Sequence, residues 1–159
     1  MKKIAVFPGS FDPFTIGHEA TVRKALHLFD EIIIAIGANA LKESYYSLET
    51  RELMISQVFK DEPRVKASHY ETLTVDYCKS VGAGYLVRGL RTSADFEFER
   101  AIAHSNKVLA PDIETVFLLT VSEYSHITST IVRDIIKNGG DASAFVPKAI
   151  DLKKFKGRD

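Results

Sequence analysis

Short apolar runs alternate with segments of helical period along the whole chain, and this alternation constrains the fold more than any other feature. The runs are rich in β-branched or aromatic residues and are bounded by Gly, Pro or charge; they are Lys3–Phe7, Ile32–Gly37, Val65–His69, Tyr85–Val87 and Thr115–Thr120. Strands that alternate with helices predict βαβ units. We therefore expect an α/β, Rossmann-like open five-stranded parallel sheet with helices on both faces.

Helix signals lie between these runs. Ser47 is placed as an N-cap before an apolar stripe that reaches Phe59, and Thr92–Asp95 reads as a capping box for a long helix that ends near Leu109. Gly82 and Gly139 follow two further helical segments, Leu73–Val81 and Ile131–Lys137. The remaining predicted helices comprise one with an apolar stripe over Val22–Phe29 and a short last one that starts at Pro147.

Composition and charge fit a single domain and exclude several classes of protein. The 159 residues include 21 Lys and Arg against 21 Asp and Glu, and this zero net charge argues against a protein that binds duplex nucleic acid, though not against one that binds nucleotides. The longest aliphatic run, Ile32–Ile36, is too short to span a membrane. The lone Cys78 allows no intrachain disulfide and is expected to pack as a small core residue. We expect one cytoplasmic domain, 1–159, without a nucleic-acid or membrane partner.

The segment after the first strand carries the most specific motif. Pro8–His18 contains two Gly and two Pro and leads directly into a helix, but it is neither a Walker loop nor a G-x-G-x-x-G fingerprint. Gly17 lets a ligand approach the helix N-terminus, where free N–H groups and the helix dipole favour phosphate. His18 adds a side-chain donor at the same place. This loop therefore predicts an anion site.

The other strand ends add groups that bind phosphate, and ligands of such sheets collect at the carboxyl ends of the strands. Lys42 follows the second strand, and a helix with Thr74 in its first turn follows the third. Arg88 and Arg91 bracket Gly89 in an expected loop that suits clamping of phosphate oxygens, and Glu99 could turn back to the same cleft. Three hydroxyl residues stand at the N-terminus of the helix that follows the fifth strand: Thr128, Ser129 and Thr130.

These groups favour direct transfer of a phosphoryl or nucleotidyl group. The cleft would offer positive charge, N–H groups and one His but no evident nucleophile, and such reactions depend mainly on positioning and electrostatics. The sequence has no H-E-x-x-H motif and no Cys pair, so we expect no metal site built by the protein.

The motifs resemble those of a known family. The G-S-F-D-P…T-x-G-H loop and the I-T-S-T segment Ile127–Thr130 resemble the nucleotidyltransferase superfamily that includes class I aminoacyl-tRNA synthetases. Arg88–Arg91, Asp95–Glu99 and the length resemble bacterial phosphopantetheine adenylyltransferases, over Ile4 to about Pro147. The resemblance implies a single nucleotidyltransferase domain, 1–159. It would transfer the adenylyl group of ATP to 4′-phosphopantetheine and so make 3′-dephospho-CoA and pyrophosphate, the penultimate step of coenzyme A biosynthesis.

The resemblance also implies residue roles. His18 would be the transition-state stabiliser at the α-phosphate, with Lys42 as a second catalytic residue. The ATP contacts would be Ser10, Phe11, His18, Gly89, Leu90, Arg91, Glu99, Tyr124, Ser125, His126, Ile127, Thr128, Ser129 and Thr130. The phosphopantetheine contacts would be Ser10, Lys42, Thr74 and Arg88. Mg²⁺ would travel with ATP, CoA would act as a feedback inhibitor, and the chain would form a homohexamer.

Two other functions remain open from the sequence. A sister nucleotidyltransferase that acts on nicotinate mononucleotide or glycerol 3-phosphate would share the first motif, but would not be expected to carry Arg88–Arg91. A non-catalytic ATP-binding module would not need His18, Lys42 and Arg88 to converge on a second substrate. Pyrophosphate release from ATP across a panel of acceptors distinguishes the three.

Overall fold

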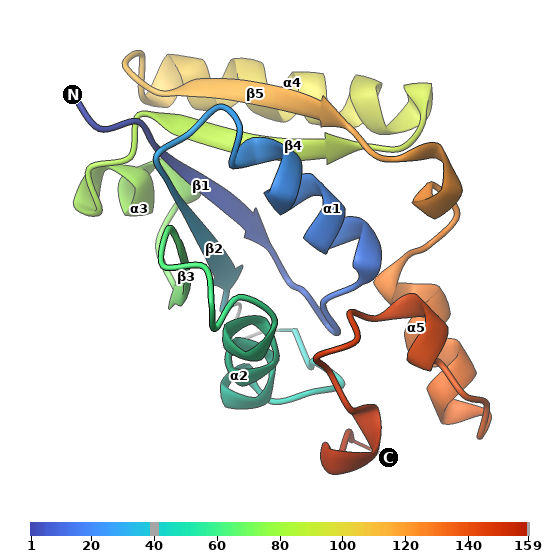
Figure 1. The fold of residues 1–159 in the computed structure, drawn as a ribbon. Coiled ribbons are helices and arrows are strands. Elements are labelled where there is room, and N and C mark those ends of the chain that lie inside the picture. The colour runs from blue at the N-terminus through green and yellow to red at the C-terminus, as the bar shows by residue number, and fades with distance from the viewer. Residues whose placement is uncertain (39–41, 159) are drawn as a thin grey trace.

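The computed structural model describes residues 1–38 and 42–158, and a parallel sheet forms its centre (Figure 1). The strands lie in the order β3-β2-β1-β4-β5, and all neighbours are parallel. They are β1 (Ile4–Gly9), β2 (Glu31–Gly37), β3 (Val65–Tyr70), β4 (Tyr85–Leu90) and β5 (Glu114–Leu119). The helices are α1 (Ile16–Ala25), α2 (Leu48–Val58), α3 (Thr74–Ser80), α4 (Ser93–Leu109) and α5 (Ser129–Lys137). The predicted α/β, Rossmann-like open parallel sheet is confirmed.

Both faces of the sheet are covered, and β2 shows why. Ile32, Ile34 and Ile36 point to one face, which packs against α1, α2 and α5, while Ile33 and Ala35 point to the other, which packs against α3. A strand that is buried on both sides needs a nearly continuous apolar run, as in Ile32–Ile36. Cys78 lies in the second of these cores, and burial raises the pKa of its thiol to about 11, so the expected packing role is confirmed.

The strand order reverses between β1 and β4, and these two strands diverge. β1 pairs with β2 along its whole length, from Ile4 opposite Glu31 to Gly9 opposite Ile36. Its pairing with β4 covers only Ala5 and Val6 among the described residues. The carboxyl ends of β1 and β4 are therefore separated, at the switch point where open α/β sheets bind ligands.

The helix caps predicted from the sequence are present in the structure. Ser47 accepts the backbone N–H of Thr50 at 3.1 Å, and Thr92 and Asp95 form the reciprocal capping box. Gly82 (φ 70°) and Gly139 (φ 77°) follow α3 and α5 in the left-handed conformation that glycine adopts without a Cβ penalty. Of the helices within residues 1–38 and 42–158, none is long and apolar enough to pass through a bilayer.

Three sequence-based expectations about the bounds of helices and strands are wrong. The first helix, α1, ends at Ala25 and does not reach Phe29. No regular helix starts at Pro147: one turn closes there through the N–H of Ile150, and Asp151 then caps a separate 3₁₀ turn, Leu152–Lys154. Strand β4 extends to Leu90 instead of ending at Val87, because β5 pairs with it up to that residue. Arg88 and Gly89 are therefore strand residues and not part of a loop.

Candidate active site

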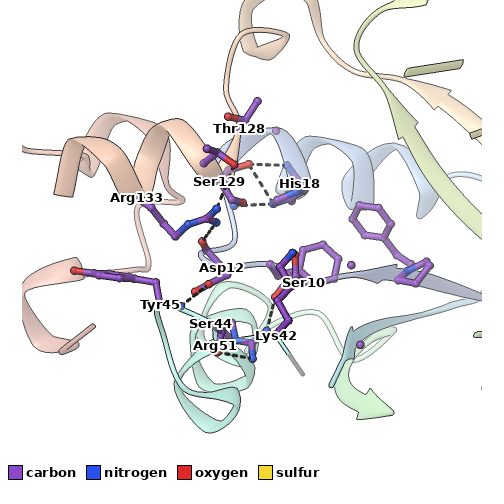
Figure 2. A pocket seen from close by; sticks show the side chains of 18 of the residues that line it. Ser10, Asp12, His18, Lys42, Ser44, Tyr45, Arg51, Thr128, Ser129 and Arg133 are labelled. Atoms are coloured by element: carbon purple, nitrogen blue, oxygen red, sulfur yellow. Dashed lines mark hydrogen bonds between the residues drawn. The ribbon is translucent and has the colours of Figure 1, made fainter. Parts of the chain in front are cut away.

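A cavity of about 990 Å³ opens at the carboxyl ends of β1, β2 and β4. Residues from the first loop, the segment that starts at Lys42, strand β4 and the N-terminus of α5 line it (Figure 2). Twelve of the predicted site residues are among them: Ser10, Phe11, His18, Lys42, Arg88, Gly89, Arg91, Glu99, Ile127, Thr128, Ser129 and Thr130. The strand ends thus bring these separate motifs to one place.

His18 stands at the start of α1 and is held by Thr15. The backbone N–H of Thr15 donates to Nδ1 of His18 at 3.0 Å, and the N–H of His18 donates to Oγ1 of Thr15 at 3.3 Å. Because Nδ1 accepts a hydrogen bond, the ring proton must be on Nε2. Desolvation, and then the nearby charges of Arg91 and Arg88, lower the pKa of His18 to about 3. His18 is a neutral imidazole whose Nε2–H is a donor.

The loop before α1 is tightly packed behind this histidine. Phe11 has a φ of 45° and is buried, with its ring edge-on to His18 at a centroid distance of 4.9 Å. A left-handed non-glycine residue is strained and persists only where its surroundings hold it. A Cβ on Gly9 would lie 2.9 Å from the Phe11 ring, so a larger residue there would displace that buried ring. The loop is a preorganised wall of the cavity.

Arg88 lies at the separation of β1 and β4. Its Nη1 donates to the Pro8 carbonyl at 2.6 Å, while Nε and Nη2 donate to the Glu99 carboxylate at 2.8 and 2.6 Å. Glu99 turns back into the cleft, as expected, and contacts Arg88. Arg91 is paired with Asp95 at 3.2 Å. Both arginines of the motif are therefore oriented by carboxylates from α4.

A second cavity, of about 320 Å³, adjoins the first. It extends between β3, α3, β4 and α4, and Tyr70, Leu86, Ile102 and Asn106 are among its lining residues. All four residues predicted for phosphopantetheine line it: Ser10, Lys42, Thr74 and Arg88. Seven residues line both cavities: Pro8, Gly9, Ser10, Gly37, Lys42, Arg88 and Glu99. The two cavities meet at the ends of β1 and β4.

The three hydroxyls at the α5 N-terminus have three different partners. Thr128 Oγ1 caps the helix by accepting the N–H of Ile131 at 3.1 Å. Ser129 Oγ donates to the Pro13 carbonyl at 2.8 Å, and Thr130 Oγ1 accepts from Arg133 at 3.2 Å. Capping thus explains one hydroxyl, while another ties α5 to the first loop. All three residues line the larger cavity, and a helix N-terminus is a place where anions are favoured.

Comparison with known proteins agrees with this geometry. The cytidylyltransferase-like family model matches residues 6–135. The phosphopantetheine adenylyltransferase of Flavobacterium psychrophilum is 56% identical over 149 residues, 94% of this chain and 98% of that protein. The enzyme of the same name from Bacteroides thetaiotaomicron is 47% identical over 148 residues, 93% of this chain and 97% of that protein. The chain belongs to the phosphopantetheine adenylyltransferase family.

The family membership confirms the resemblance read from the motifs and makes the chain a nucleotidyltransferase enzyme. A solved structure supports the fold. The bifunctional NMN adenylyltransferase/ADP ribose pyrophosphatase of Francisella tularensis, complexed with AMP and a Mn ion, has a TM-score of 0.68 and 18% identity. The match covers 98% of this chain and 47% of that protein, so it shows a shared fold alone.

Several residues predicted from the family resemblance do not line the cavities. Among the described residues these are Leu90, Tyr124, Ser125 and His126. Leu90 is buried in the sheet, and Tyr124 packs against the main core. Conversely, Asp12, Arg51 and Arg133 line the larger cavity and were not predicted. Arg133 lies three residues beyond Thr130 on α5, so helical spacing could have found it; Arg51 carries no such local signal.

The carboxylates around the larger cavity bear on metal binding in this family. Within residues 1–38 and 42–158, no three His, Cys, Asp or Glu side chains gather into a group that could hold a metal ion. Three lining carboxylates are already engaged: Glu99 by Arg88, Asp95 by Arg91, and Asp12 by backbone N–H groups. This arrangement fits a divalent cation that phosphate oxygens of a nucleotide would carry.

Proposed function

We propose that this enzyme transfers the adenylyl group of ATP to 4′-phosphopantetheine and releases pyrophosphate, with 3′-dephospho-CoA as the product. The observation that carries the proposal is the junction of two cavities at Ser10, Lys42 and Arg88. The larger cavity would take ATP against the first loop and the α5 N-terminus. The smaller one would take the pantetheine arm, so that the two phosphates meet where the cavities join.

The reaction we propose is a single in-line displacement. A phosphate oxygen of phosphopantetheine attacks the α-phosphorus of ATP, and the bond from that phosphorus to the bridging oxygen breaks as pyrophosphate leaves. His18 does not serve as a nucleophile, because Nδ1 accepts the Thr15 N–H and Nε2 carries the proton. Cys78 is buried in the core on the other face of the sheet. These two facts support the proposal of direct transfer without a covalent intermediate.

In this scheme His18 stabilises the transition state. Its Nε2–H would donate to an α-phosphate oxygen as negative charge develops there. A neutral donor held by Thr15 needs no rearrangement during the step. Arg88 and Lys42 would hold the attacking phosphate, and a guanidinium that Glu99 already orients presents its donors in a fixed plane. Positioning and electrostatics supply the catalysis.

ATP would enter as its Mg²⁺ complex, in which the cation neutralises phosphate charge and the protein supplies Arg91, Arg133 and the α5 N-terminus around the triphosphate. Asp95 and Glu99 are occupied by arginines, so they leave the cation to the nucleotide. We further propose cytoplasmic location, for which the reduced, buried Cys78 is suitable. CoA would bind as a feedback inhibitor because it contains both halves of the product.

A homohexamer is also part of the proposal, and the surface of α4 and β5 supports association. Phe98, Val108 and Leu109 of α4 and Leu119 of β5 are exposed large apolar side chains. Such a surface favours contact with another protein chain. Light scattering with size-exclusion chromatography measures the assembly directly, and a monomer at micromolar concentration would contradict this part of the proposal.

Pyrophosphate release from ATP tests the function. The purified enzyme is assayed with 4′-phosphopantetheine, nicotinate mononucleotide, glycerol 3-phosphate or no acceptor. We expect release only with phosphopantetheine, together with a product of the mass of dephospho-CoA. Turnover with another acceptor would identify a sister enzyme instead, and ATP binding without release under all conditions would indicate a non-catalytic module.

A further inference from the structure

Two buried charged residues outside the proposed mechanism join the first loop to the segment that carries Lys42. The carboxylate of Asp12 accepts the backbone N–H of Tyr45 at 2.7 Å and that of Tyr46 at 2.8 Å. These bonds connect positions more than thirty residues apart in the chain. Asp12 is only 6% exposed, so the two N–H groups compensate a carboxylate that has little access to water.

Arg51 of α2 makes the second connection between the same two segments. Its Nη1 donates to the Ser10 carbonyl at 2.7 Å, and Nη2 donates to Ser44 Oγ at 3.3 Å. Its Nε donates to the carbonyl of Ser47, the N-cap residue of α2, at 3.4 Å. Arg51 is also 6% exposed. Figure 2 shows Arg51 and Ser44 together below the first loop, with Asp12 between Tyr45 and Arg133.

The bonds of these two side chains indicate what they do. Both oxygens of Asp12 accept backbone N–H groups, and all three kinds of guanidinium nitrogen of Arg51 donate within the protein. Both side chains are therefore bonded into the wall of the larger cavity, which they line. They hold Ser10 against the segment Ser44–Tyr46, which begins two residues after Lys42. Ser10 and Lys42 each line both cavities. A buried polar network whose members are all hydrogen-bonded makes the geometry around it rigid.

We propose that Asp12 and Arg51 are positioning residues that act through Lys42: they hold the Lys42 segment against the first loop and so set where the acceptor phosphate lies relative to Ser10 and His18. This inference rests on the proposed function for the role of Lys42. It assigns no chemical step to Asp12 or Arg51 themselves.

The first loop has supports that the Lys42 segment does not share. The first loop has further supports from α5, since Arg133 Nη1 donates to the Asp12 carbonyl at 2.7 Å and Ser129 Oγ donates to the Pro13 carbonyl at 2.8 Å. Removing the Asp12 carboxylate leaves those bonds intact. The Lys42 segment would therefore become more mobile than the first loop. We expect binding and positioning of the acceptor to be impaired more than binding of ATP.

Asp12→Asn and Arg51→Lys test the proposal. Asparagine keeps the size of Asp12, but its NH₂ group is a donor and cannot accept one of the two backbone N–H groups. Lysine keeps the charge of Arg51 but lacks the planar guanidinium that reaches three acceptors at once. For each we expect kcat to fall at least about tenfold and the KM for phosphopantetheine to rise at least about fivefold. The Kd for ATP, titrated without acceptor, should stay within about threefold because α5 still holds the loop.

Glu31→Gln is the matched control. Glu31 is likewise 6% exposed and accepts two charged donors, Lys2 at 2.6 Å and Lys66 at 2.8 Å, but it lies at the opposite, amino end of β2. This variant should lose thermal stability and keep the wild-type kinetic constants. A purely structural role of Asp12 would give the same pattern as Glu31→Gln, namely a lower Tm with unchanged kcat and KM, and would overturn the proposal.

A double-mutant cycle with Lys42→Ala shows whether the effect passes through Lys42. If it does, Asp12→Asn should raise the phosphopantetheine KM much less in the Lys42→Ala background than in the wild type. Additive effects, or a Kd for ATP that weakens as much as the acceptor KM, would overturn it. Should Asp12→Asn fail to fold, Ser44→Ala removes one Arg51 bond and must show the same direction with a smaller size. Failure of the wild type to turn over phosphopantetheine would instead refute the proposed function, before any variant is compared.

Discussion

Thr15 and His18 hold each other at the first turn of α1: each backbone N–H donates to the side chain of the other residue, at 3.0 Å to Nδ1 of His18 and at 3.3 Å to Oγ1 of Thr15. The pair caps the helix and also fixes which nitrogen of His18 carries the proton. The sequence motif T-x-G-H thus has a direct structural meaning, because the spacing of three residues is the spacing of a capping box. Nε2 of His18, which takes no part in this pair, carries the ring proton.

Replacement of His18 by alanine should lower kcat by roughly 10²–10³, the cost of removing one preorganised donor from a developing negative charge. Affinity for ATP should change much less, since many N–H groups share the ground-state binding. Steady-state kinetics and an ATP titration on the same preparation measure both. A variant that keeps near wild-type kcat would remove His18 from the transition state.

The low pKa of His18 predicts how stability depends on pH. The folded protein holds this imidazole neutral down to a pH of about 3, whereas in the unfolded chain it takes up a proton near its ordinary value of about 6.5. The unfolded state therefore binds more protons between these values, and His18 makes the free energy of unfolding decrease as pH falls through that window.

His18→Asn should consequently lose less stability than the wild type between pH 7 and pH 4. Urea unfolding at several pH values gives the two curves, and we expect the fall to be smaller by at least about 1 kcal/mol in the variant. Parallel curves would mean that the histidine is protonated in the folded state as easily as in the unfolded one.

Arg88→Lys should raise the KM for phosphopantetheine by about tenfold or more while the protein folds normally. Lysine keeps the positive charge but lacks the planar guanidinium that bonds Glu99 through two nitrogens and Pro8 through the third. Initial rates at saturating ATP give the acceptor KM, with circular dichroism as the folding control. If the acceptor KM were unchanged, Arg88 would belong to the ATP side alone.

CoA should compete with phosphopantetheine, because one pantetheine arm excludes another from the smaller cavity. The extra 3′-phosphate of CoA meets a site that already carries Lys42, Arg88 and Arg91. Higher ionic strength should therefore weaken CoA binding more than that of unphosphorylated pantetheine. Titration of CoA at several fixed phosphopantetheine concentrations decides the point: inhibition that does not change with phosphopantetheine would place CoA at another site.

Local signals in the sequence were sufficient for the fold and for part of the site. Ser47, Thr92 and Gly82 act within one helical turn of their own positions, so their roles could be predicted without a partner. The error at β4 has a physical cause: a charged residue and a glycine normally end a strand, but β5 supplies hydrogen-bond partners up to Leu90 and Glu99 compensates the Arg88 charge.

The sequence by itself determined the parallel α/β sheet and the capping of α1 by its T-x-G-H motif, because both follow from periodicity and from contacts between near neighbours. Only the tertiary structure decided which groups work together. It paired Arg88 with Glu99, lowered the pKa of His18 by burial and nearby arginines, and joined Asp12 and Arg51 to the Lys42 segment. These relationships link residues from different elements, and the energies that select them arise only when the chain has folded and water has been excluded.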